Sequence, residues 1–309
     1  MDYLRKMISE VKKSDNQQLV LQNNPDVTLY IKREDLLHPH ISGNKYRKLK
    51  YNLQQARLEN KTTLLTFGGV YSNHIAATAA AGKEFGFNTI GVIRGEELSA
   101  ENPSSPTLHF AKSNGMQLHF ISRENYRLKD TAEFLLKLEQ QFGDFYLIPE
   151  GGTNSLAVKG CEEILTDEDA CFDFICAAVG TGGTISGLVN TSKVHQKVIG
   201  FSALKGDFLS EEVKKWTGKN NWHITDGYCF GGYAKINRDL IEFINQFKQE
   251  TGIQLDPVYN GKMMYGIFKM IAEEKFPKKS RILAVHTGGL QGIAGMNENL
   301  KKRNLPLIQ

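Results

Sequence analysis

The fold is decided by FDFICAAVGTGGTISGLVN, residues 172–190. Phe174 to Val179 form a short apolar run typical of a β-strand, and the glycines that follow lead into a stretch expected to be helical. Glycines let backbone N–H groups approach a phosphate, the start of a helix favours an anion, and threonine hydroxyls add donors. The spacing from Gly180 to Gly187 matches neither a P-loop nor a clean dinucleotide fingerprint. The alternatives are a generic glycine-rich turn and a site for a compact phosphate-bearing group.

The same succession of apolar run, turn and helical stretch recurs along the chain. Strands that alternate with helices indicate mostly parallel sheets in an α/β fold. Helices are expected at Asn73 to Phe85, where small residues dominate, and at Asp130 to Gln141, where apolar residues recur at helical spacing. The further expected strands are Thr63 to Phe67, Thr89 to Ile93, Gln117 to Ile121, Val198 to Ser202 and Ile282 to Val285.

Length and composition indicate an ordinary globular protein. The 309 residues are 40% hydrophobic and 23% charged, which suits a chain that buries a substantial core without metals or disulfides. This length favours one large lobe or two closely packed lobes with a cleft between them. The net charge of +4 is spread along the whole chain, so a nucleic-acid partner is not indicated.

The cysteines and the N-terminal segment indicate in which cellular compartment the protein is expected. The four cysteines lack a CxxC pair and a histidine at ligand spacing, so we expect reduced, mostly buried thiols and no metal site. The segment from Met1 to Lys13 lacks an apolar core followed by a cleavage site, and no apolar run approaches membrane-spanning length. A cytoplasmic protein with no membrane partner is therefore expected.

Lys45 is the first candidate for covalent chemistry, and it lies in SGNKYRK, residues 42–48. A lysine amine is nucleophilic only after it loses a proton near neutral pH. A desolvated pocket or a neighbouring cation such as Arg47 or Lys48 favours that loss. The alternative interpretation is a basic helix start after a glycine turn.

Two more glycine-rich segments follow expected strands. GGVYSNH, residues 68–74, places Ser72 and Asn73 where a helix N-cap is wanted. The hydroxyl and the exposed N–H groups of such a cap can also bind a carboxylate, and both roles can hold at once. VHTGGL, residues 285–290, adds a third strand exit, in which a structural role is expected for His286. Because ligands of open α/β sheets bind beyond the carboxyl ends of the strands, the three glycine-rich loops should meet at one site.

Two tyrosines stand beside glycine or proline turns, Tyr233 in FGGYAK, residues 230–235, and Tyr259 in LDPVYNGK, residues 255–262. Tyrosines in such places are commonly half-buried packing residues. Near a cationic group, either one can instead serve as a general acid, a base or a nucleophile.

Taken in this order, the segments resemble the family of 1-aminocyclopropane-1-carboxylate deaminase and D-cysteine desulfhydrase, within the tryptophan-synthase-β-like (fold type II) pyridoxal-phosphate enzymes. The resemblance runs from Ile31-Lys32-Arg33-Glu34-Asp35 to His286-Thr287-Gly288-Gly289, which is most of the chain. It implies a two-domain α/β fold, pyridoxal 5'-phosphate as cofactor and a small amino acid as substrate. It also implies a large domain of residues 1–50 and 155–309, a small domain of residues 51–154, an active site in the cleft between them, and usually a homodimer.

The resemblance also implies roles for individual residues. Lys45 would hold the cofactor as a Schiff base and move the substrate proton, and Ser72 would meet the substrate carboxylate. Tyr233 and Tyr259 would flank the substrate, while Asn73 would hydrogen-bond the ring hydroxyl of the cofactor. The phosphate would be held by Lys48, Thr181, Gly182, Gly183 and Thr184.

Thr287 separates the two activities of the family. A carboxylate at the ring nitrogen of the cofactor makes a strong electron sink, whereas a neutral hydroxyl leaves the sink weaker and suits loss of a β-leaving group. The deaminases resembled here carry Glu at the position of Asn260 and Leu at that of Thr287, and threonine at the latter position matches the desulfhydrases. We therefore expect β-elimination from D-cysteine. The alternatives are deamination of 1-aminocyclopropane-1-carboxylate and binding of the cofactor or an amino acid without turnover.

Three residues depart from the pattern of the family. Asn260 is not the threonine expected of a desulfhydrase, and Tyr46 and Tyr71 are bulkier than the residues of either branch. If both tyrosine rings face the cleft, the substrate differs from both named compounds.

Overall fold

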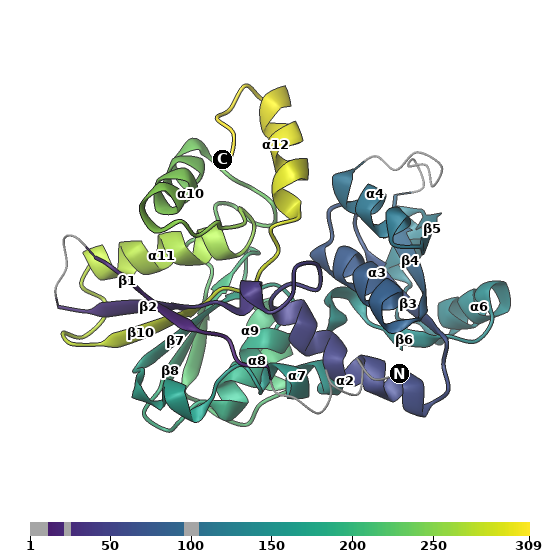
Figure 1. The fold of residues 1–309 in the computed structure, drawn as a ribbon, viewed down its shortest axis with the longest axis horizontal. Helices are drawn as coiled ribbons and strands as arrows, with labels where there is room; N and C mark the ends of the chain where they lie inside the picture. The colour runs from purple at the N-terminus through teal and green to yellow at the C-terminus, as the bar shows by residue number, and fades with distance from the viewer. Residues whose placement is uncertain (1–11, 22–25, 96–104) are drawn as a thin grey trace.

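The chain forms two α/β units, each built on its own sheet (Figure 1). The computed structural model describes residues 12–21, 26–95 and 105–309. The larger sheet has the order β1-β2-β10-β7-β8-β9, and only the β1–β2 pair is antiparallel. Its strands are β1 (Asn16–Leu19), β2 (Thr28–Lys32), β7 (Phe174–Val179), β8 (Lys197–Ser202), β9 (Trp222–Thr225) and β10 (Arg281–Val285).

The smaller sheet has the order β5-β4-β3-β6 and is parallel throughout. Its strands are β3 (Thr63–Gly68), β4 (Asn88–Arg94), β5 (Met116–Ile121) and β6 (Tyr146–Ile148). The helices grouped with this sheet are α3 (Asn73–Phe85), α4 (Pro106–Ser113), α5 (Arg123–Arg127) and α6 (Ala132–Phe142). The helices grouped with the larger sheet are α7 (Ser155–Cys161), α8 (Gly183–Thr191), α9 (Phe208–Lys214), α10 (Arg238–Thr251), α11 (Asn260–Ala272) and α12 (Gly292–Lys302).

Strand β7 is apolar throughout because both of its faces are buried. Phe174, Cys176 and Ala178 belong to a core cluster with residues of α10 and α11. The alternate residues Ile175, Ala177 and Val179 belong to a second cluster on the opposite face, with residues of α8. Helices on both faces of a parallel sheet are the arrangement that such runs predict. The α/β expectation is confirmed.

The expected elements are present, with small shifts at their ends. All six expected strands form, and α3 has the predicted bounds. Helix α6 begins two residues later than expected because the Thr131 side chain caps it, accepting a hydrogen bond from the backbone N–H of Phe134. Four strands were missed: β1, β2, β6 and β9.

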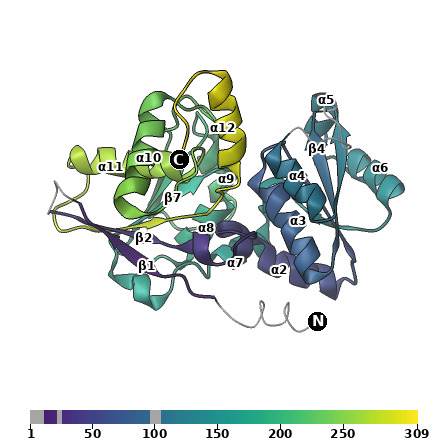
Figure 2. The ribbon, with the colours of Figure 1, turned by 45° about the horizontal axis from the view of Figure 1, so that its top comes forward.

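Helix α2 (Asn44–Leu58) runs along the boundary between the two units in both ribbon views (Figures 1 and 2). It packs against α7, and the side chains of Asn52 and Asn154 exchange hydrogen bonds of 2.7 and 3.2 Å across that contact. The places where the chain enters and leaves the smaller unit therefore lie side by side. A division into residues 1–50 with 155–309 and residues 51–154 stays a prediction.

The state of the cysteines and the character of the helices are relevant to the expected cellular compartment. Cys161, Cys176 and Cys229 are buried free thiols, and Cys171 is an exposed one. Within the described ranges, no helix combines the length and the apolar character that crossing a membrane requires.

Candidate active site

A cavity of about 1160 Å³ opens where the carboxyl ends of β3, β7 and β10 approach one another. The three glycine-rich loops after these strands line it, so the expectation that they share one site is confirmed. The cavity is also lined by all but one of the residues proposed for the site. These are Lys45, Lys48, Ser72, Asn73, Thr181, Gly182, Thr184, Tyr233, Tyr259 and Thr287, and the exception is Gly183.

Lys45 lies at the start of α2, where a close backbone contact positions it. Gly43 has a φ of 59°, and any side chain at this position would overlap the carbonyl group of Thr287. The backbone N–H of Asn44 also donates to the Thr287 carbonyl at 3.3 Å. The loop that carries Lys45 is thus docked onto the loop after β10, and glycine is required for that approach.

The Lys45 amine is set up to lose its proton near neutral pH. Burial, and then the positive charge of Lys48, lowers the pKa of Lys45 to about 7. Its Nζ donates to Asn44 Oδ1 at 3.0 Å. Arg47, the other cation considered from the sequence, is buried elsewhere and pairs with Glu34 at 2.8 Å. The neighbouring cation that lowers the pKa of Lys45 is therefore Lys48.

Lys48 and the loop after β7 form a compact anion site. Lys48 Nζ donates to Thr153 Oγ1 at 2.9 Å, to Gly151 O at 3.0 Å and to Thr181 Oγ1 at 3.3 Å. The first hydrogen bond within α8 runs from Ser186 N to Gly182 O, so the preceding N–H groups of the helix point out of its end. An ammonium, two hydroxyls and a helix N-terminus together suit a phosphate.

Gly183 lies behind this site rather than on its wall. A Cβ at this position would stand 2.9 Å from Thr153 Oγ1 and 3.4 Å from Lys48 Cε. Its small size lets Lys48 reach the loop. Thr153 was missed from the sequence, although it follows Gly151 and Gly152 directly after β6. That fourth glycine-rich strand exit is a usable signal, obscured because β6 has only three residues.

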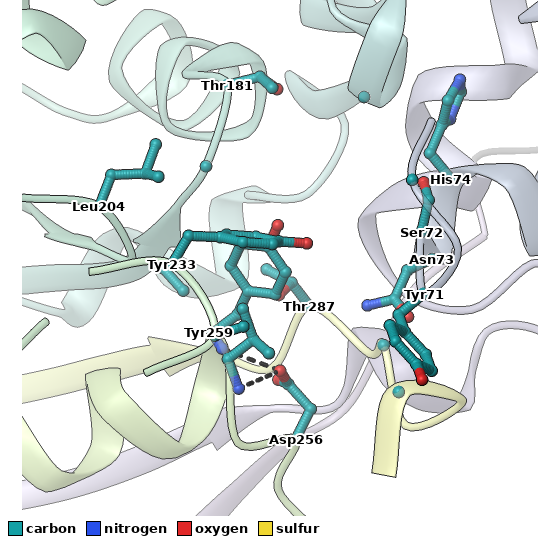
Figure 3. A pocket seen from close by; sticks show the side chains of 18 of the residues that line it. Tyr71, Ser72, Asn73, His74, Thr181, Leu204, Tyr233, Asp256, Tyr259 and Thr287 are labelled. Atoms are coloured by element: carbon teal, nitrogen blue, oxygen red, sulfur yellow. Dashed lines mark hydrogen bonds between the residues drawn. The ribbon is translucent and has the colours of Figure 1, made fainter. Parts of the chain in front are cut away.

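Ser72 and Asn73 begin α3, as expected for a helix cap. Ser72 Oγ accepts a hydrogen bond from Ile75 N at 3.3 Å. Asn73 Oδ1 is buried, and within the described part of the chain it has no hydrogen-bond partner. Buried polar atoms are normally paired, so this oxygen marks a place where a donor group of a ligand is wanted. Figure 3 shows Asn73 projecting toward the space between the two units.

Tyr233 and Tyr259 lie edge to face on the opposite wall, with ring centroids 6.3 Å apart (Figure 3). Both line the cavity, and the Tyr233 residue is 49% exposed. Burial is the largest cause that raises the pKa of each hydroxyl. Both hydroxyls are therefore protonated at neutral pH and act as hydrogen-bond donors.

Thr287 belongs to a buried hydrogen-bond network that links it through Asn260 to Asp256. Asn260 Oδ1 accepts from Thr287 N at 2.9 Å and from Thr287 Oγ1 at 3.2 Å, and Asn260 Nδ2 donates to Gly288 O at 2.8 Å. Asn260 Nδ2 also donates to Asp256 Oδ1 at 2.7 Å. The Asp256 carboxylate accepts three further hydrogen bonds, from the backbone N–H groups of residues 258, 259 and 260. The polar side chain that Thr287 contacts is therefore a neutral amide.

His286 is structural, as expected. Its Nε2 hydrogen-bonds Gln254 O at 2.7 Å, and its Nδ1 accepts from Gly288 N at 3.1 Å. The ring is fully buried and holds the loop after β10 in place.

The two unusual tyrosines have different environments. Tyr46 is buried in the core of the smaller unit and stacks on His38, with ring centroids 6.3 Å apart. Tyr71 lines the cavity and packs against α12, where a side chain at Gly295 would overlap its ring. Only Tyr71 can therefore restrict the ligand directly.

Comparisons with known proteins agree with this geometry. The family model "Pyridoxal-phosphate dependent enzyme" matches residues 18–288. A bifunctional D-cysteine desulfhydrase/1-aminocyclopropane-1-carboxylate deaminase of Arabidopsis thaliana, named as mitochondrial, is 34% identical over 86% of this chain and 73% of its own length. A putative 1-aminocyclopropane-1-carboxylate deaminase of Pyrococcus furiosus is 33% identical over 85% of each chain.

Solved structures show the same relationship. The crystal structure of an ACC deaminase homologue has a TM-score of 0.79 and 26% identity, and covers 98% of this chain and 99% of that one. The expected resemblance is confirmed on sequence and on fold. Because the matched segment contains Lys45, both tyrosines and the glycine-rich loops as far as residue 288, the chain belongs to the family of pyridoxal-phosphate-dependent enzymes.

Proposed function

We propose that this lyase eliminates the β-substituent of D-cysteine or of a related β-substituted small amino acid. With D-cysteine and water, the products are sulfide, pyruvate and ammonia. The observation that carries the proposal is the neutral pair of Thr287 and Asn260 at the loop after β10. The proposal includes a homodimer, as the family resemblance implies, and the cytoplasmic location expected from the sequence.

The residues of the cavity fit pyridoxal 5'-phosphate. Lys48, Thr181 and the start of α8 suit its phosphate, and the unpaired Asn73 Oδ1 suits a ring hydroxyl that donates a hydrogen bond. Thr184 Oγ1 already accepts from Asn44 Nδ2 at 2.8 Å, which ties the phosphate loop to the residue before Lys45. When bound, the cofactor supplies an electron sink for charge that develops on the substrate.

The side chains around Lys45 support a proton transfer at the substrate α-carbon. An amine with a pKa of about 7 has both protonation states available at neutral pH, which suits a group that accepts and returns a proton. Ser72 and the N-terminus of α3 suit the substrate carboxylate, because an anion is favoured at a helix start. Tyr233 and Tyr259, as neutral hydroxyls, suit donation to a departing group.

The neutral surroundings of Thr287 favour elimination over ring opening. A carboxylate beside the ring nitrogen would keep that nitrogen protonated, whereas the Thr287 hydroxyl can serve an unprotonated nitrogen by turning toward it the proton that it donates to Asn260 Oδ1. Asp256 is the buried carboxyl group of the network, and it accepts four hydrogen bonds. Three come from the backbone N–H groups of residues 258, 259 and 260, and one comes from Asn260 Nδ2. The acid is thus separated from Thr287 by the Asn260 amide.

The second candidate is deamination of 1-aminocyclopropane-1-carboxylate to 2-oxobutanoate and ammonia. It is favoured by the bifunctional name of the Arabidopsis relative. A protein that only binds its ligand has no need of a lysine with so low a pKa beside two protonated tyrosines, so this third alternative is disfavoured.

The test is an assay of the cofactor-loaded protein with D-cysteine, L-cysteine and 1-aminocyclopropane-1-carboxylate. Sulfide and pyruvate from D-cysteine are expected, and Lys45→Ala should abolish both the turnover and the visible absorbance of the Schiff base. Formation of 2-oxobutanoate without sulfide would favour the second candidate. Turnover by Lys45→Ala at the wild-type rate would overturn the assignment of Lys45.

A further inference from the structure

Lys262 is a buried lysine whose position is unfavourable on electrostatic grounds. It is the third residue of α11, where a helix disfavours positive charge, and the residue is only 2% exposed. Within the described ranges it forms no ion pair with a carboxylate. Burial lowers the pKa of Lys262 to about 8. A buried ammonium without a carboxylate partner is expected to destabilise the fold, so the presence of Lys262 indicates a role other than stability.

The Lys262 ammonium holds the turn that presents Tyr233. Nζ donates to Cys229 O at 2.8 Å and to Gly232 O at 2.7 Å. The same two carbonyls accept backbone hydrogen bonds, from Gly232 N at 3.1 Å and from Lys235 N at 3.2 Å. Lys262 therefore joins two consecutive turns, and Tyr233 lies in the second.

This segment needs such support because its backbone is strained. Phe230 and Ala234 have φ values of 56° and 55°, which side chains other than glycine rarely adopt. Gly231 and Gly232 are also left-handed, at 91° and 121°. Conformations of this kind persist only where the surrounding structure enforces them.

Helix α11 is in contact with the segments that carry both tyrosines. Tyr259 is its N-cap residue, and the Phe230 ring packs edge to face on Tyr265 of the same helix at 4.9 Å. Lys262, one turn from Tyr259, adds the polar attachment. We propose that Lys262 is a positioning residue that holds the 229–235 segment on α11 and so keeps Tyr233 in contact with Tyr259. This inference rests on the proposed role of Tyr233 in the reaction.

Hydrogen exchange of the cofactor-loaded protein tests the attachment without any substrate. Lys262→Met keeps the length of the side chain and removes its donors, so amides of residues 229–235 should exchange at least about 10-fold faster. Lys262→Gln keeps two N–H donors and should show a smaller increase. Lys301→Met is the matched control, because this exposed lysine lies on α12 and is not part of the cavity lining. Unchanged exchange in Lys262→Met would overturn the inference.

A double-mutant cycle with Tyr233→Ala tests the functional part. Lys262→Met should lower kcat/KM about 10- to 100-fold, and adding it to Tyr233→Ala should cause little further loss. Independent, multiplicative losses would show that Lys262 does not act through Tyr233 and would overturn the inference. If the wild type turns over none of the three substrates, the proposed function fails, while the exchange result still decides on the attachment.

Discussion

Asn260→Asp should make the stability of the protein depend strongly on pH. Asn260 is fully buried, and its Nδ2 lies 2.7 Å from Asp256 Oδ1 and 2.8 Å from Gly288 O. The substitution replaces this donor by an oxygen that faces two acceptors. A protonated carboxyl can still donate to one of them, whereas a carboxylate repels both.

The size of the pH effect on stability follows from the number of protons bound by the folded and by the unfolded variant. Burial beside Asp256 should raise the pKa of the introduced carboxyl above its unfolded value of about 4. The folded variant then binds more protons than the unfolded chain between these two pKa values. Stability relative to wild type should fall by about 1.4 kcal/mol per pH unit as pH rises through this window. At neutral pH the total loss should be about 3–5 kcal/mol, as for an uncompensated buried charge.

Thermal unfolding of the cofactor-loaded protein at pH 5 and pH 7.5 measures this dependence. The loss in Tm should be larger at pH 7.5 than at pH 5, because about 3 kcal/mol separates the two conditions, and each kcal/mol corresponds to about 2–4 °C. Asn88→Asp, at the exposed start of β4, is the control and should change little at either pH. Equal losses at both pH values would refute the reasoning, because they would show that the introduced carboxyl keeps an ordinary pKa.

Three further predictions concern cofactor binding. Capture of pyridoxal 5'-phosphate by the cofactor-free protein should speed up as pH rises through about 7, where Lys45 loses its proton; a midpoint near 10.5 would contradict the lowered pKa. Gly43→Ala should weaken cofactor affinity at least about 10-fold in a spectroscopic titration, because a methyl group would displace the Thr287 carbonyl; unchanged affinity would argue against that contact. Lys48→Met should weaken binding of the phosphorylated cofactor about 10- to 100-fold and that of pyridoxal much less; equal effects on both would remove Lys48 from the phosphate site.

The elements that the sequence predicts well are those whose burial is complete. β7 reads as an unbroken apolar run because helices cover both faces, and α3 has a recognisable cap in Ser72. β1, with the sequence NQQL, is a mostly polar edge strand, and β6 has three residues. Strands so short or so polar carry no periodicity, so local pattern could not reveal them.

The residues of the candidate site differ in whether the sequence alone draws attention to them. Lys45 and Ser72 are singled out from the sequence because each stands in a glycine-rich segment with its own local signature, whereas Thr287 is singled out by the family resemblance. Thr153 is missed because the three-residue β6 obscures the glycine-rich strand exit before it, and its partner Lys48 is distant in sequence. Lys262 is missed because its partner Gly232 is distant in sequence. Such partners are set by the packing of α2 against α7 and of the 229–235 segment on α11, which single-sequence patterns do not contain.

The contrast between Tyr46 and Tyr71 shows where local pattern is sufficient. Tyr46 is followed on α2 by Leu49, Leu53 and Ala56, an apolar spacing that is typical of a core-facing helix side and was not used in the prediction for Tyr46. Tyr71 stands in a turn before a helix cap, without periodicity, and its neighbour Gly295 comes from the far end of the chain. The departure from the family pattern at Tyr46 therefore bears on the core of the smaller unit. The departure at Tyr71 bears on the cavity, and differences in substrate between this chain and its relatives should be sought there.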